Sequence, residues 1–175
     1  QRLLQVAVNR KPELLLSALR RSGAIGRREP LSWLSPLAPT YTEYKDGAAL
    51  SQLGLKLKTP LNTFWPSRGP VLDGLALAGE RPVLLEAKAH IPEDVSPPSK
   101  ATNPTSAQLI ATSLALAKKH YGPRSQATWG SIFYQYANRL AYQYFLRQLN
   151  GVPSSLVFLY FTNATANGGD IALAG

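Results

Sequence analysis

Two short apolar runs with a tight turn between them are the feature that most constrains the fold of this chain. The runs cover residues 71–77 and 82–89, and Gly79 stands in the four residues that join them. Glycine at the first central position of a two-residue loop favours a type II′ turn, so the runs are predicted to form a β-hairpin. Counting outward from the turn on both strands places Asp73 directly opposite Glu86.

The alternation of side chains along a strand brings a lysine to the same face as these two acids. Opposed carboxylates have Cβ atoms only about 4.5–5.5 Å apart and repel each other, so we expect a divalent cation to offset the repulsion. Asp73, Glu86 and the backbone carbonyl of Ala87 are hard oxygen ligands of the kind Mg²⁺ prefers, and Mn²⁺ is an alternative ion. The ammonium of Lys88 would polarise an attacking water, so this group predicts metal-dependent hydrolysis of a phosphodiester.

A simpler interpretation of the same residues stays open. A Glu-x-Lys tripeptide on a strand is common, and Glu86 with Lys88 would then be a solvated ion pair worth less than about 1 kcal/mol. The proposed pairing of Asp73 with Glu86 also depends on the register, because a slip by one residue turns one side chain to the other face.

The net charge favours a polyanionic partner. The chain has 19 Lys and Arg against 10 Asp and Glu, which gives +9, and +5 of this lies in the first thirty residues. Such a field attracts nucleic acid, and Arg20 and Arg21 are candidate contacts in this basic segment. General solubility is the alternative explanation.

Helix and strand signals predict a mixed α/β fold. A connector is predicted over residues 29–39 from its three prolines. Helices are predicted over residues 12–23, 41–53, 105–121 and 131–149, and a strand buried on both faces over residues 156–161. This order predicts a mixed β-sheet flanked by helices, with residues 1–39 as a basic helical N-terminal extension and residues 40–175 as the core.

The composition excludes several other classes of protein. No apolar run reaches 18 residues, so no membrane span is expected, and the cytoplasm is the default compartment. The chain has no cysteine, which excludes disulfides, thiolate zinc sites and a cysteine nucleophile.

At the hairpin the sequence resembles the PD-(D/E)XK nuclease superfamily, which has the restriction-endonuclease-like fold. The matching segments are Pro70-Val71-Leu72-Asp73-Gly74 and Glu86-Ala87-Lys88, and Leu72 stands where the family has proline. The resemblance covers most of the chain except its first forty residues and implies a core order αβββαβ. It also implies that Asp73 and Glu86 bind the metal and that Lys88 assists catalysis.

The resemblance suggests further site residues, each with a structural alternative. Many members carry an acid on the first core helix, and Glu43 is the candidate, although Thr40 and Glu43 also fit a capping box. Some members have a glutamine after the lysine strand, and Gln135 is similar to it. Arg139 is a candidate phosphate contact on the same helix, with a solvated face as the alternative for both.

The loop that follows the lysine strand, residues 92–104, provides the last candidates. Lys100 within it is a candidate DNA contact, and an inert connector is the alternative. His90 is expected on the face of Asp73, where capping the strand end is its simpler role.

The leading hypothesis is therefore a Mg²⁺-dependent deoxyribonuclease. A catalytically silent, nuclease-like nucleic-acid-binding module is the main alternative, and a phosphatase is a weaker one because no phosphate-cradling glycine loop is present. RNA as the substrate and a homodimer as the assembly are both compatible with the sequence.

Overall fold

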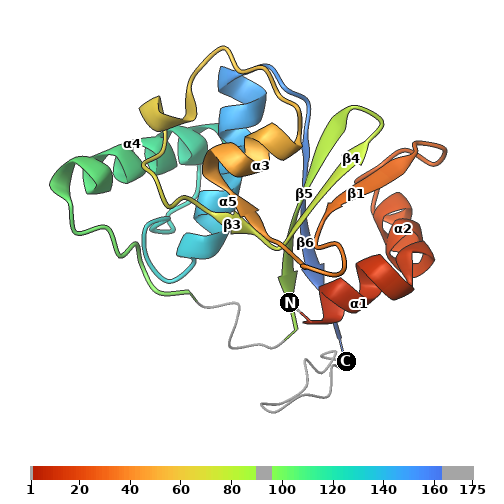
Figure 1. The fold of residues 1–175 in the computed structure, drawn as a ribbon. Helices are drawn as coiled ribbons and strands as arrows, with labels where there is room; N and C mark the ends of the chain where they lie inside the picture. The colour runs from red at the N-terminus through yellow and green to blue at the C-terminus, as the bar shows by residue number, and fades with distance from the viewer. Residues whose placement is uncertain (1, 90–95, 163–175) are drawn as a thin grey trace.

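A computed structural model describes residues 2–89 and 96–162 of the chain (Figure 1). The helices are α1 (Arg2–Arg10), α2 (Pro12–Arg21), α3 (Asp46–Gln52), α4 (Pro104–Tyr121) and α5 (Tyr134–Tyr144), with a 3₁₀ turn η1 (Leu61–Thr63) and a π-helical turn η3 (Phe145–Leu149). The strands are β1 (Leu31–Ser35), β2 (Tyr44–Lys45), β3 (Val71–Leu72), β4 (Gly74–Ala78), β5 (Arg81–Lys88) and β6 (Ser155–Tyr160).

Four of the strands form an open mixed sheet in the order β1-β4-β5-β6. The pairs β1/β4 and β4/β5 are antiparallel, and β5/β6 is parallel. The short strands β2 and β3 form a separate antiparallel pair. The predicted mixed α/β class, with helices and a mixed sheet, is therefore confirmed.

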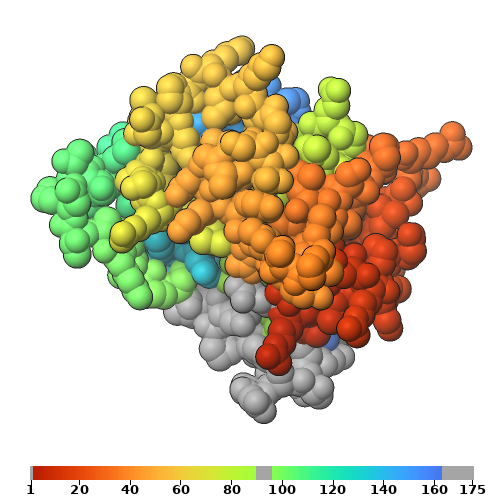
Figure 2. Space-filling view, in the orientation of Figure 1, coloured from red at the N-terminus to blue at the C-terminus, as the bar shows by residue number. Residues whose placement is uncertain are grey.

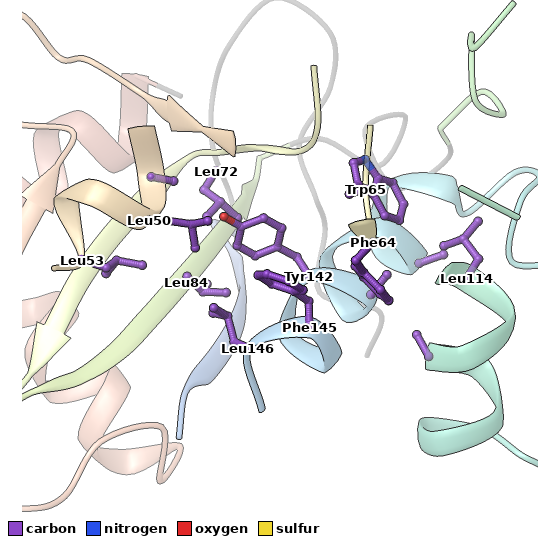
Figure 3. Packing of buried hydrophobic residues seen from close by; sticks show 14 of the residues in the cluster. Leu50, Leu53, Phe64, Trp65, Leu72, Leu84, Leu114, Tyr142, Phe145 and Leu146 are labelled. Carbon is purple, nitrogen blue, oxygen red and sulfur yellow. The ribbon is translucent and has the colours of Figure 1, made fainter. Parts of the chain in front are cut away.

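The helices cover the sheet on both faces, as Figure 1 shows. Alternate residues of β5 point to opposite faces: Val83 and Leu85 pack with α1 and α2, whereas Leu84 packs with α3, α4 and α5. The larger cluster, drawn in Figure 3, brings Leu84 together with Tyr142 and Phe145. Full burial of one such aliphatic side chain contributes about 1.5–3 kcal/mol. Glu86 and Lys88 continue the Leu84 face, so the candidate site lies on the side of α4 and α5.

The N-terminal part of the chain differs from the prediction in two elements. Helix α2 matches the predicted helix, but α1 precedes it, with Leu4 and Val8 buried against the sheet. The predicted connector contains β1, which pairs with β4. Its prolines lie outside the strand, where they remove no ladder hydrogen bond. Strand β1 of the main sheet therefore lies on the N-terminal side of the proposed boundary after residue 39.

Helix α3 begins five residues later than the predicted start at Tyr41. Thr40 is not its N-cap, because Tyr44 and Lys45 are extended and pair with β3 before the helix begins. The Thr40 hydroxyl instead lies 3.0 Å from the Thr42 hydroxyl. The predicted capping box with Glu43 is therefore wrong.

The C-terminal elements follow the prediction with smaller differences. Helix α4 matches its predicted range, and the side chain of Asn103 caps it by accepting a hydrogen bond from Ser106 N. Helix α5 begins three residues later than expected and ends in the π-helical turn. Strand β6 is half-buried rather than buried on both faces, because within the described part of the chain it lies at an edge of the sheet. Among the helices of these residues, none is both long and apolar enough to cross a bilayer.

Candidate active site

The hairpin has the predicted register. Ala78 pairs with Arg81 next to the turn, and Gly74 pairs with Leu85 at the far end of β4. Gly79 has a φ of +57°, whereas Glu80 is not among the residues with positive φ, as expected for a type II′ turn. This register places Asp73 and Glu86 one step beyond the last pair.

Asp73 lies at the corner where the chain passes from β3 to β4. Its Oδ2 accepts a hydrogen bond from the backbone N–H of Ala87 at 2.8 Å. The Asp73 carboxylate therefore accepts the hydrogen bond that a backbone carbonyl would accept if the β4/β5 pairing continued beyond Gly74 and Leu85. Asp73 is half-buried, so its side chain is fixed against β5 and still partly accessible to solvent.

Glu86 is buried on β5 between two cations. Its relative exposure is 2%, compared with 5% for Lys88 and 4% for Arg139. Glu86 Oε1 lies 2.9 Å from Lys88 Nζ, and Oε2 lies 2.7 Å from both Nε and Nη2 of Arg139. A buried carboxylate without such partners would be strongly destabilising, so these contacts offset the cost of burying Glu86.

Two side chains of helix α5 contact Lys88 and Glu86. Gln135 and Arg139 are one helical turn apart, about 6 Å along the axis. Glu86 and Lys88 are two residues apart on β5, roughly 6.6 Å. The matching spacings let Gln135 Oε1 accept from Lys88 Nζ at 2.6 Å while Arg139 binds Glu86.

Both helix residues are anchored by further hydrogen bonds. The backbone N–H of Gln135 donates to the Ser96 hydroxyl at 2.8 Å. Arg139 also donates to the Val71 carbonyl at 2.5 Å and to Asn138 Oδ1 at 2.7 Å. Arg139 therefore connects β3, β5 and α5, and in this structure it is not on an exposed helix face.

Glu43 lies in the segment directly before β2 and is not part of a helix. Tyr44 pairs with Leu72, and continuing that antiparallel register by one residue places Glu43 opposite Asp73. The predicted helical location of Glu43 is wrong, but the β2/β3 register brings it close to Asp73. Burial raises the pKa of Glu43, and the charges of Asp73 and Glu86 raise it further.

The two predicted ligands also interact with each other. Burial is the largest cause that raises the pKa of Asp73, and the negative charge of Glu86 is the second. The hydrogen bond from Ala87 and the charge of Arg139 oppose this shift but do not reverse it. The site therefore keeps a repulsion between carboxylates that a bound cation would reduce.

The backbone of Ala87 presents an oxygen on the same side. The Lys88 carbonyl accepts from Phe161 N at 2.8 Å toward β6, whereas the Ala87 N–H points to Asp73. Because successive residues of a strand direct their backbone groups to alternate edges, the Ala87 carbonyl also faces the Asp73 side.

The oxygen donors fit a hard cation if the backbone takes part. Glu86 Oε1 contacts Lys88 and Oε2 contacts two nitrogens of Arg139, which uses three of the about four acceptor positions of a carboxylate, so about one position remains for an ion. Across residues 2–89 and 96–162, no three His, Cys, Asp or Glu side chains form a group that could hold a metal ion. An ion here would therefore depend on Asp73, Glu86, the Ala87 carbonyl and water.

The remaining predicted residues are distributed around this centre. Lys100 lines a cleft of about 660 Å³ that also includes Gln135 and Arg139. Arg20 and Arg21 belong to α2 on the opposite face of the sheet, so the structure does not bring them to the carboxylates. His90 lies outside the described residues.

The contact of Arg139 with Glu86 is the part of the site that sequence reasoning missed. The available signal was the four-residue spacing of Gln135 and Arg139 beside the two-residue spacing of Glu86 and Lys88. No family model, no curated protein and no solved structure matches the chain.

Proposed function

We propose that this chain is a divalent-metal-dependent nuclease of the PD-(D/E)XK type that hydrolyses phosphodiester bonds in DNA. The observation that supports the proposal is the clustering of Asp73, Glu86 and Lys88 at the end of the hairpin, where Asp73 accepts from Ala87 N–H and Lys88 contacts Glu86. A lone Glu-x-Lys would be weak support. The hydrogen bond from Ala87 N–H to the Asp73 carboxylate brings a second acid to the tripeptide and makes the motif more specific.

In this proposal Asp73, Glu86 and the Ala87 carbonyl hold Mg²⁺, or Mn²⁺ in its place. Such an ion, when bound, supplies positive charge to a phosphoryl oxygen and lowers the pKa of a bound water. Glu43 does not form a metal-holding group of three with Asp73 and Glu86, so in this proposal it is not a direct ligand. Its negative charge would act on the site from a distance.

Lys88 is the residue proposed to act on the water and on the phosphate. Its ammonium has three donors, and contacts with Glu86 and Gln135 use two of them. The third can donate to an attacking water or to a nonbridging phosphate oxygen, where negative charge increases in the transition state. Gln135 holds the ammonium in place and is a positioning residue.

The positive net charge supports a polyanionic substrate. At +9 the protein attracts nucleic acid over long range, and the screening length at physiological salt is about 8 Å. Phosphate contacts provide affinity without sequence preference, so the proposal includes no recognition sequence.

Incubation of single-stranded, supercoiled and linear DNA with Mg²⁺ tests the proposal directly. We expect wild-type cleavage that EDTA abolishes and that falls by about 10²–10³-fold in Asp73→Asn, Glu86→Gln and Lys88→Met. Glu80→Gln is the matched control, because Glu80 is an exposed acid on the same hairpin. Cleavage that persists in all three site variants would refute the proposed site.

One observation favours the second candidate, a nucleic-acid-binding module without catalysis. Arg139 and Lys88 already place two positive charges against Glu86, so the buried carboxylate is balanced without any metal. In that case wild-type protein would bind DNA and would leave both DNA and RNA intact in the presence of Mg²⁺.

A further inference from the structure

A cleft of about 660 Å³ opens next to the carboxylate pair. Residues 65–71 form one wall, residues 96–103 form the other, and Gln135 and Arg139 of α5 contribute to its base. Figure 2 shows a hollow between the yellow segment before β3 and the green segment before α4, with α5 visible inside it. The cleft therefore reaches the two side chains that contact Lys88 and Glu86.

The charge of the lining is entirely positive. Its ionisable residues are Arg68, Lys100, Arg139 and Tyr134, and the lining contains no Asp or Glu. Arg139 is neutralised by Glu86, whereas Arg68 and Lys100 are exposed on opposite walls. Two exposed cations in the lining of one cleft favour an extended anion that contacts both.

The wall that carries Arg68 is held in a fixed conformation. The Asp46 carboxylate accepts hydrogen bonds from Arg68 N at 3.0 Å and from Gly69 N at 2.7 Å. Arg68 has a φ of +66°, a backbone conformation that residues other than glycine rarely adopt. A Cβ on Gly69 would lie 2.5 Å from Asp46 Oδ1, so this position has no room for a side chain. Backbone strain of this kind persists only where neighbouring groups enforce it, and it is frequent at binding sites.

The rest of the lining offers neutral hydrogen-bonding groups. Ser99, Thr102 and Asn103 lie on the Lys100 side, and Asn138 lies at the base beside Gln135. Hydroxyl and amide groups of this kind bind phosphate and sugar oxygens without requiring a particular sequence.

We propose that this cleft binds an unpaired segment of a DNA strand beside the bond to be cleaved, so that single-stranded DNA or frayed ends are the substrate class. The volume lies within the range of about 300–1,000 Å³ that encloses a ligand of small-molecule size. One strand can pass between the walls, whereas a duplex brings two backbones and would remain outside. The statement about cleavage rests on the proposed function, but strand binding does not.

Fluorescence anisotropy in EDTA tests binding without cleavage. The probes are a fluorescein-labelled oligodeoxythymidylate of about 12 nucleotides and a blunt hairpin duplex of similar length, a size within the usual range of single-strand sites. The cleft variant is Arg68→Ala/Lys100→Ala. The matched control is Lys119→Ala/Arg124→Ala, which removes the same charge from exposed residues at the far end of α4. Lys119 lies roughly 22 Å along the helix from Pro104.

We expect wild-type protein to bind the single strand more tightly than the hairpin at about 0.15 M salt. The cleft variant should lose at least about tenfold in single-strand affinity, because each charge-assisted contact is worth about that factor. The slope of log K against log salt should fall by about 1.4, since each phosphate contact on a single strand contributes about 0.7. The control should change neither quantity comparably.

Two results would overturn the inference: equal affinity for strand and hairpin, or an equal loss in the control variant. Cleft-dependent strand binding without Mg²⁺-dependent cleavage would contradict the proposed function and would leave this inference standing.

Discussion

Replacing Arg139 with methionine tests the buried charge network at its centre. Arg139 places Nε and Nη2 at 2.7 Å from Glu86 Oε2, and both residues are almost fully buried. Methionine keeps much of the aliphatic volume but removes the charge and all the donors. The substitution therefore leaves Glu86 with Lys88, at 2.9 Å, as its remaining cationic partner among the described residues.

The magnitude follows from the cost of an uncompensated buried charge. Removing one partner of a buried ion pair costs about 3–5 kcal/mol. Because Lys88 remains on the other oxygen, we expect a value near the lower limit, about 3 kcal/mol. For a chain of this size that corresponds to a fall in Tm of roughly 6–12 °C, and it is a large fraction of a typical stability of about 5–15 kcal/mol.

Urea unfolding measures this difference, with a second ion pair of the same chain as the control. Glu29 and Arg81 are 2.7 Å apart, but 25% and 27% of their side-chain surfaces are exposed. Glu29→Gln should therefore cost less than about 1 kcal/mol. The double variant Arg139→Met/Glu86→Gln should be clearly more stable than the sum of the single effects predicts.

A loss below about 1 kcal/mol in Arg139→Met would refute the reasoning, because a charged Glu86 could not lose this partner so cheaply. A purely additive double variant would contradict it as well. If the carboxylates hold a divalent cation, Mg²⁺ should also stabilise Arg139→Met more than wild type, since the added charge replaces the lost guanidinium.

Two further predictions concern the acids and the cleft wall. Burial and the charge of Glu86 raise the pKa of Asp73, so the native state binds the proton of this carboxyl more tightly than the unfolded chain does. The free energy of unfolding should therefore decrease as the pH rises above about 3.9, the ordinary pKa of aspartate. Asp73→Asn keeps an acceptor for Ala87 N–H. In metal-free urea unfolding, its free energy of unfolding should match that of wild type near pH 3 and exceed it by roughly 0.2–1 kcal/mol at neutral pH. A wild-type protein that is more stable than Asp73→Asn at neutral pH would argue against the raised pKa. Gly69→Ala should destabilise by about 1–3 kcal/mol in the same assay, because its Cβ meets Asp46 Oδ1 at 2.5 Å. Gly47→Ala, with no atom within 4 Å of its Cβ, should be neutral or stabilising by up to about 1 kcal/mol, and similar behaviour of the two variants would contradict the close packing at Gly69.

The hairpin could be predicted because its information is local. Gly79 sets the turn, the turn sets the register, and the register places Asp73 beside the peptide that follows Glu86. The ranges of α2 and α4 follow from equally local signals, such as proline in the first turn. These elements need no knowledge of distant parts of the chain.

The misjudged elements depend on distant partners. Glu43 matched a capping pattern, but pairing of Tyr44 with Leu72, 28 residues later, kept the backbone extended and delayed α3. The strand β1 was hidden by its flanking prolines and is defined by its pairing with β4. Arg139 carried no local sign of burial, since an arginine on a helix is mostly exposed, and the spacing that matches it to Glu86 becomes informative only when α5 is known to pack on β5.

Isothermal titration calorimetry with Mn²⁺ and Mg²⁺ tests most directly whether Asp73 and Glu86 jointly hold a cation. We expect one ion per chain in wild type, together with a rise in unfolding free energy of about 1.4 kcal/mol at ten times the Kd. Asp73→Asn should bind at least about tenfold more weakly, since it removes one of two charged ligands, whereas Glu80→Gln should bind as wild type does. Joint cation binding by Asp73 and Glu86 is contradicted if wild-type protein shows no metal binding, or if Asp73→Asn binds with unchanged affinity.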